Sequence, residues 1–157
     1  MTNIELENAE LIMPFRNFSG KPSKFNREGS RNFAVYIPDE IVEDLQKDGW
    51  NVKYTNRKSE EYDSRPYLPV AVNFEYRPPA IYVGVDSDHM RKLEEETVGE
   101  LDWAEIQHVD MSIRPRPYDW NGKSGVKAYL AEMYVIIAKP SSFADKYHSE
   151  DDENLPF

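Results

Sequence analysis

The sequence of 157 residues contains no cysteine. A disulfide framework, a thiol nucleophile and cysteine-ligated zinc or iron–sulfur sites are therefore excluded. No apolar run approaches the ~20 residues that a membrane-spanning helix needs. The first residues, Met1–Glu5, show neither the basic region nor the apolar stretch of a secretory signal. We therefore expect a cytoplasmic protein with no membrane partner.

The sequence also lacks recognisable catalytic motifs. Its three histidines, at 89, 108 and 148, match no spacing typical of zinc or non-haem iron sites. The segment Asp86–His89 is better interpreted as the capped start of a helix than as a metal site. Gly122–Gly125 lacks the spacing of a phosphate-binding loop, and no Gly-x-Ser-x-Gly occurs. We predict a protein that is not an enzyme, with no catalytic residues, no metal and no cofactor.

The residues that are present suffice for one domain with a modest core. Apolar residues make up 39% of the chain and aromatic residues 13%, which opposes the disorder that a negative mean hydropathy favours. Alternating or β-rich segments predict strands at 4–13, 32–37, 50–54, 68–76, 81–85, 109–113 and 126–138. Helical patterns predict short helices at 40–47 and 86–93, and the Asn-Gly pair predicts a hairpin loop at 121–125.

This order of elements indicates the fold class. Helices do not alternate with strands, so a barrel or sandwich is favoured over an α/β sheet. We predict an all-β fold with two short helices: an OB-fold-like, five-stranded Greek-key barrel with extra strands. The barrel domain is expected at 1–141 and a disordered acidic C-terminal tail at 142–157.

Charge is unevenly distributed. The net charge is −10, yet basic residues gather in three segments, 16–31, 53–65 and 114–127, where aromatic residues accompany them. Cations that follow phosphates and rings that stack on bases are the two devices that hold single-stranded nucleic acid. The candidate DNA-binding residues are Arg16, Lys21, Lys24, Phe25, Arg27, Arg31, Tyr54, Arg57, Lys58, Tyr62, Arg65, Tyr76, Arg77, Arg114, Arg116, Tyr118, Trp120, Lys123 and Lys127.

The third basic segment offers a geometric expectation. If the strand continues beyond Ile113, then Arg114, Arg116, Tyr118 and Trp120 share the face opposite the core. The prolines at 115 and 117 lack backbone donors, which predicts a sheet edge or the base of a loop. A competing interpretation is that rings in alternating strands fill the core and that loop cations are merely solvated.

The end of the chain is the most specific feature of the sequence. Five acids against one lysine follow Ser142, and the chain ends in two exposed apolar residues around a proline. A solubility tail does not account for that ending, whereas a docking peptide does. The acids can also compete with DNA for the basic surface. The predicted partner-binding residues are Glu150, Asp151, Asp152, Glu153, Asn154, Leu155, Pro156 and Phe157.

Two resemblances follow from these residues. The tail resembles the terminal peptide of bacterial single-stranded DNA-binding proteins, an acidic run before Ile-Pro-Phe, with Leu155 in place of isoleucine. The body resembles bacteriophage single-stranded DNA-binding proteins of the OB-fold type, through residues 121–135 and 143–147. The resemblance implies a protein of phage replication, recombination and repair that coats unwound DNA in an infected bacterium. It also implies recruitment of replisome proteins (a polymerase, helicase, primase or recombination exonuclease) through the tail, by a monomer or homodimer.

Two other functions remain open at this point. An acidic DNA mimic or a phage structural protein would use the negative charge itself and would not bind DNA, although the cations in the loops oppose this. A small-molecule hydrolase has no residue pattern in its favour.

Overall fold

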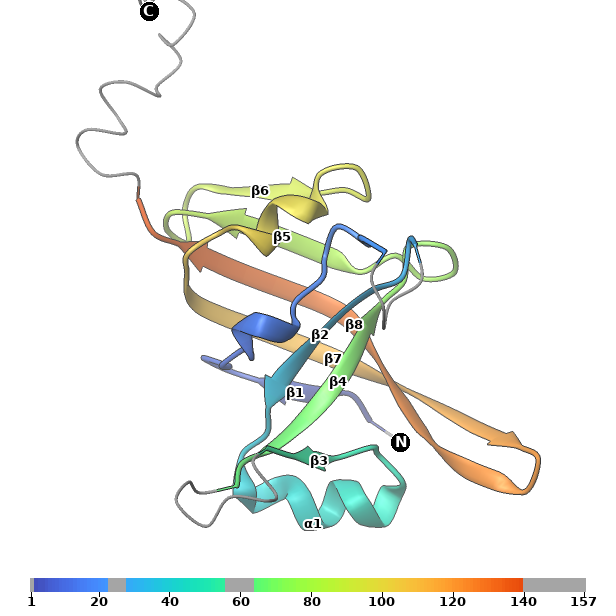
Figure 1. Ribbon diagram of the computed structural model, residues 1–157. Coiled ribbons are helices and arrows are strands. Elements are labelled where there is room, and N and C mark those ends of the chain that lie inside the picture. The colour runs from blue at the N-terminus through green and yellow to red at the C-terminus, as the bar shows by residue number, and fades with distance from the viewer. Residues whose placement is uncertain (1, 23–27, 56–63, 140–157) are drawn as a thin grey trace, which may run out of the picture.

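The computed structural model describes residues 2–22, 28–55 and 64–139. It is mostly β-sheet, with one α-helix and two 3-10 turns (Figure 1). In chain order the elements are β1 (Ile4–Leu6), η1 (Met13–Phe15), β2 (Arg31–Tyr36), α1 (Asp39–Asp48), β3 (Lys53–Tyr54), β4 (Pro66–Val72), β5 (Ala80–Gly84), β6 (Met90–Leu93), η2 (Val98–Asp102), β7 (Ile106–Trp120) and β8 (Lys123–Ile137).

Strand β8 organises the barrel, because both of its edges are used along its length. One edge pairs antiparallel with β7, and the other meets Trp50, then β4, then β5. The path β1-β7-β8-β4-β2 therefore curls around one core, in which Phe33, Val35 and Met133 are completely or almost completely buried. This is an OB-like architecture, as the sequence predicted.

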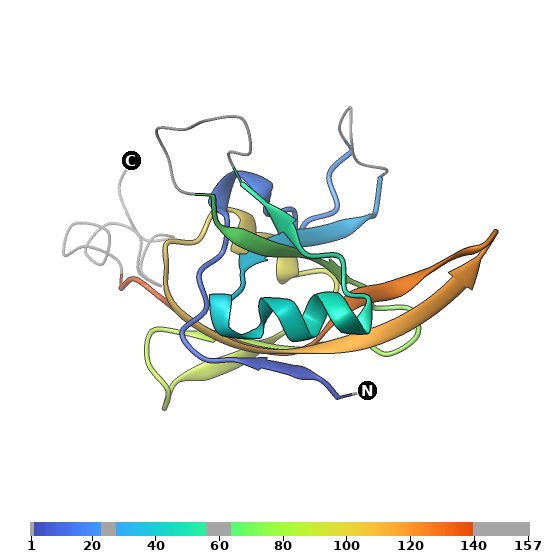
Figure 2. The ribbon, with the colours of Figure 1, turned by 90° about the horizontal axis from the view of Figure 1, so that it is seen from below.

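The helix expected at 40–47 is confirmed as α1. Asp39 and Glu40 lie in its first turn, where acids favour the positive end of the helix dipole, and Lys47 lies in its last turn. Val42 and Leu45 are buried. The helix closes one end of the barrel beside β3 (Figures 1 and 2).

The prediction of a second helix at 86–93 is wrong. Asp86 accepts a hydrogen bond from the backbone of Asp88 and pairs with His89, which closes a turn, and β6 follows. β6 pairs antiparallel with β5, so sheet pairing outweighs the local capping pattern.

Strands β7 and β8 form a long hairpin that extends away from the barrel (Figures 1 and 2). The loop expected at 121–125 is shorter in the structure, because Lys123 already pairs with Trp120. Asn121 and Gly122 have φ angles of 53° and 76°, the left-handed values that a tight two-residue turn requires and that Asn-Gly tolerates. The strand expected at 109–113 therefore continues to the turn.

A β-bulge divides β8. Ser112 pairs with Glu132 but Ile113 pairs with Leu130, so Ala131 has no partner in β7. Beyond the bulge the buried positions of β8 change from odd to even numbers, from Met133 to Leu130. The strand expected at 126–138 is confirmed within β8, but the bulge was not predicted.

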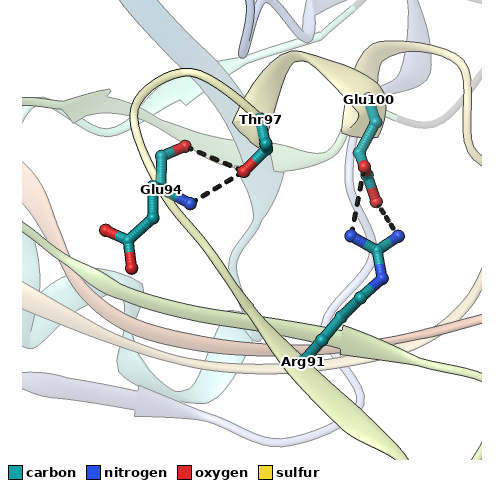
Figure 3. Close-up of polar contacts among 4 residues, drawn as sticks. All are labelled: Arg91, Glu94, Thr97 and Glu100. Atoms are coloured by element: carbon teal, nitrogen blue, oxygen red, sulfur yellow. Dashed lines mark hydrogen bonds and ion pairs between the residues drawn. The ribbon is translucent and has the colours of Figure 1, made fainter.

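The acid-rich connection after β6 is held by polar contacts (Figure 3). The hydroxyl of Thr97 accepts a hydrogen bond from the backbone N–H of Glu94, and the carboxylate of Glu100 pairs with Arg91. These contacts fix η2 next to β6. In the described part of the chain, no helix has the length and apolar character to span a membrane.

Candidate nucleic-acid interface

Four strands bring one residue each into a single row across the outer face of the sheet. Asn32 of β2 pairs with Ala71 of β4, Ala71 pairs with Tyr129 of β8, and Tyr129 pairs with Arg114 of β7. Paired residues in a sheet point to the same side. The neighbours Phe33 and Leu130 are buried, so this row faces away from the core.

Two adjoining hollows lie along this row, and we call them together the central groove. Their volumes are about 400 and 590 Å³. Both are lined by Ser30, Arg31, Ala71 and Lys127, which come from β2 and its approach, β4 and β8. The groove therefore runs between the barrel and the base of the protruding hairpin.

The projecting part of the hairpin carries a cationic and aromatic face. Arg116 pairs with Lys127, and Trp120 pairs with Lys123, on the same side of the ribbon as Arg114. Tyr118 packs across Gly125, where an added Cβ would lie 2.7 Å from the tyrosine hydroxyl oxygen. The expectation that the alternate residues 114–120 share one face is confirmed.

The prolines of this segment lie on a sheet edge. Ile113 is the last residue of β7 that pairs with β1, so beyond it that edge of β7 has no partner among the described residues. Pro115 and Pro117 therefore interrupt no ladder on that edge. Of the two alternatives, the edge is confirmed, and the base of a loop is wrong.

The arginines of this face raise the local positive potential. Partial burial, and then the charge of Arg77, lower the pKa of the Arg114 guanidinium, and Arg116 acts in the same direction. Arg114 is thus held among like charges, which an anion would relieve. Within the described part of the chain, no ion pair links these three arginines, Lys123 or Lys127 to an acid.

Tyr129 lies at the centre of the row, and it is not among the residues predicted from the sequence. Its ring centre is 5.3 Å from Lys127 Nζ and 5.7 Å from the guanidinium carbon of Arg116. The tyrosine therefore holds two cations at the groove. Its signal in the sequence was its spacing of two residues from Lys127, which places both on one face of a strand.

Arg31 lies on β2, where it lines both hollows of the groove. It pairs with Glu95 at 3.5 Å and lies over the ring of Phe74, at 5.6 Å from the ring centre. Its Nε atom is buried and has no hydrogen-bond partner among the described residues. Burial of a charged donor without a partner is costly, so Arg31 is held in place at a cost to the fold.

Other candidate residues lie outside the groove. Arg16 donates to the backbone carbonyls of Leu101 and Ala104, and Arg65 covers the ring of Tyr36 while pairing with Glu10. Lys21 lies over Trp103, Tyr54 is half-buried against the core, and Tyr76 is 80% exposed between β4 and β5.

The remaining candidates fall outside the described residues. These are Lys24, Phe25, Arg27, Arg57, Lys58, Tyr62 and the tail residues Glu150 to Phe157. The boundary between barrel and tail at 141/142 lies there too and stays a prediction. Over residues 2–22, 28–55 and 64–139, no group of three or more metal-binding side chains is present.

Comparison with known proteins identifies the family of this chain. The sequence model of a family described as a putative phage ssDNA-binding domain matches residues 1–153. The chain belongs to this family. The family is that of bacteriophage single-stranded DNA-binding proteins, as the resemblance of the body implied. No curated protein matches the sequence.

Solved structures of the same fold include those of a single-stranded DNA-binding protein from bacteriophage Enc34. Its complex with ssDNA has a TM-score of 0.57 to this chain, at 12% identity, and the match covers 88% of each chain. Its C-terminal truncation has a TM-score of 0.56 at 13% identity, with 88% of this chain and 87% of that chain covered. At such identities the likeness concerns the fold, while the family supports single-stranded DNA binding for this chain.

Proposed function

We propose that this protein coats single-stranded DNA without sequence specificity during phage replication and recombination. The strand would cross the outer face of β2, β4, β8 and β7, through the central groove and onto the hairpin. The observation that carries this proposal is the arginine cluster around Arg114, which has no acid partner in the described part of the chain and adjoins the ring of Tyr129.

The chemistry of the face supports a strand with exposed bases. Arg114, Arg116 and Lys127 are placed to neutralise phosphates, and the indole of Trp120, 75% exposed, offers a stacking surface. Every base has a face that can stack, so this mode tolerates any sequence. In a duplex the bases are already stacked on one another and are not available to these rings.

The direct test is a fluorescence titration of the full chain with oligo-dT and with duplex DNA of equal length. Trp50 is 5% exposed, whereas Trp103 and Trp120 are each 75% exposed and can report a bound base. We expect quenching by oligo-dT that weakens between about 50 and about 200 mM salt. Equal affinity for duplex, or no binding to either, would refute the proposal, and the second result would favour an acidic DNA mimic.

We further propose that the C-terminal tail recruits replication proteins. The support is its sequence, an acidic run before Leu155–Phe157, since an apolar terminus beside acids suits a pocket with a basic rim. Deleting Asn154–Phe157 should abolish capture of a phage or host polymerase or helicase while DNA affinity stays intact. Deletion from Glu150 should instead raise DNA affinity, most clearly at low salt. Unchanged capture by the shorter deletion would contradict this role.

A further inference from the structure

A second surface of aromatic residues and cations lies at the far end of the row described above. We call it the Trp103 hollow, a cavity of about 970 Å³ lined by Met13, Phe15, Arg16, Lys21, Asn32 and Trp103, among others. Phe15 is 60% exposed and Trp103 is 75% exposed. Large apolar side chains that gather in an exposed hollow indicate a binding surface.

The Trp103 side chain is exposed to solvent, and hydrogen bonds fix the backbone of its loop. Asp102, its neighbour at the end of η2, accepts hydrogen bonds from the backbone N–H groups of Phe18 at 2.6 Å and Ser19 at 3.2 Å. From the other side, Arg16 Nη1 donates to the carbonyls of Leu101 and Ala104 at 2.8 and 2.9 Å. The indole is thus presented by a preorganised loop.

The cation at this ring is also positioned. The Asn17 side-chain oxygen accepts from the backbone of Gly20 at 2.9 Å and of Lys21 at 3.0 Å, and its amide donates back to the Lys21 carbonyl. This turn sets Lys21 Nζ 4.2 Å from the centre of the Trp103 ring. Among the described residues that line the hollow, Asp102 is the only acid, and backbone N–H groups engage both of its oxygens.

The hollow adjoins the central groove at Asn32. Asn17 forms a bridge with Asn32, which extends the row from Arg114 by one more residue on the same face. Asn32 lines both the hollow and the groove. At the usual spacing between strands, Asn17 lies about 19 Å from Arg114 along the row.

We propose that the Trp103 hollow is a second stacking site for the same strand of DNA. A strand that leaves the groove at Asn32 places a base on Trp103, beside Phe15, and a phosphate near Lys21. The combination of a cation with an exposed indole, next to a groove that leads past Lys127 to the arginines of the hairpin, favours nucleic acid over an apolar peptide. This inference rests on the proposed function and extends the footprint of the same site.

The test measures the Kd for oligo-dT of graded length, from about 4 to about 16 nucleotides. The unchanged full chain is compared with the full chain that carries Trp103→Ala. We expect the Kd for the longest oligomers to rise about tenfold and the Kd for the shortest to stay unchanged. Trp103→Phe should restore most of the affinity. Tyr134→Ala is the matched control, because Tyr134 is an exposed ring on β8 away from both surfaces.

Two further measurements separate stacking from a general effect. Lys21→Gln should make the negative slope of log K against log salt less steep by about 0.7, and only for long oligomers. With Trp120→Phe in place, long oligo-dT should still quench the emission of Trp103.

The outcomes are distinct. Loss of affinity by Trp103→Ala at every length, or at none, while Arg114→Ala still weakens binding, would overturn the second site alone. If Arg114→Ala also leaves all affinities unchanged, the proposed function fails as well.

Discussion

The two halves of the β7–β8 hairpin are built from the same strands but carry opposite charge. The base half, 106–112 with 132–137, presents Asp110 and Glu132, whereas the outer half, 113–120 with 123–130, presents Arg114, Arg116 and Lys127. The bulge at Ala131 separates them.

The halves differ equally in how their polar groups are used. In the base half, Asp110 accepts from the backbone of Asn8 at 2.8 Å, and Ser112 donates to Glu5 at 2.9 Å. The cations of the outer half have no acid partner in the described residues. Charges that are paired within the chain stabilise the fold, and charges left unpaired on a shared face are available to a ligand. The predictions below test this division.

Deleting Ala131 should have the largest effect, because it removes the division itself. Without the extra residue, one half of β8 must turn its core residues outward, since a slip of one residue exchanges the two faces of a strand. We expect the free energy of unfolding to fall by more than about 4 kcal/mol, with no cooperative thermal transition by circular dichroism. Ala131→Gly keeps the extra residue and should cost about 1 kcal/mol or less. A stable, cooperative deletion variant would contradict the structural role of the bulge.

Removing two cations from the outer half should have the next largest effect. Arg114→Ala with Arg116→Ala should raise the Kd for oligo-dT about 100-fold, because each charged hydrogen bond contributes on the order of tenfold. The negative slope of log K against log salt should become less steep by about 1.4. The control is Lys47→Ala with Lys92→Ala, which changes net charge equally, on α1 and β6. Similar losses in both double variants would mean that overall charge, and not this face, governs binding.

An exposed ring on each half gives a smaller and cleaner contrast. Trp120→Ala should raise the Kd about fivefold to tenfold through loss of base stacking. Tyr134→Ala removes a ring from the base half, where it stacks on Tyr82 at 5.2 Å, and should leave the Kd unchanged. Thermal unfolding of both variants checks that the fold is intact. A larger loss from Tyr134→Ala would reverse the assignment of the two halves.

Much of this division could be predicted from the sequence. Alternation over 109–113 fixed which side of β7 faces the core, and its continuation placed Arg114 and Trp120 on the outer face. Asn121-Gly122 indicated the turn. The bulge could not be predicted with the same ease, because Val126 to Ala138 is apolar at both odd and even positions and supports either register.

The candidate site was only partly predictable for a related reason. A cation in a sequence shows its charge but not its partners. Arg16 and Arg31 lie in the same basic segment of the sequence. Arg16 donates hydrogen bonds to two backbone carbonyls, whereas Arg31 lines the groove. The sequence does not indicate the place of Trp103, because its loop is shaped by contacts of Asp102 with Phe18 and Ser19, which are more than 80 residues away in the chain.

The smallest effect is expected from Asp110→Asn, which removes a paired charge from the base half. The hydrogen bond from the Asn8 backbone, together with that from His108, lowers the pKa of Asp110, while burial acts in the opposite direction. The folded state therefore favours the carboxylate. Its contribution to stability is complete above the unfolded pKa of 3.8 and is lost as the pH falls through the lower folded value.

We therefore expect Asp110→Asn to lower Tm by no more than about 2 °C at neutral pH, since half-exposed pairs contribute little. The difference from the unchanged protein should vanish in acid, because both side chains are then neutral. The variant keeps an oxygen that can accept from Asn8, so the loop stays in place, and the Kd for oligo-dT should stay within about twofold at physiological salt. A tenfold change in Kd would mean that the base half takes part in binding, and the division between the halves would then fail.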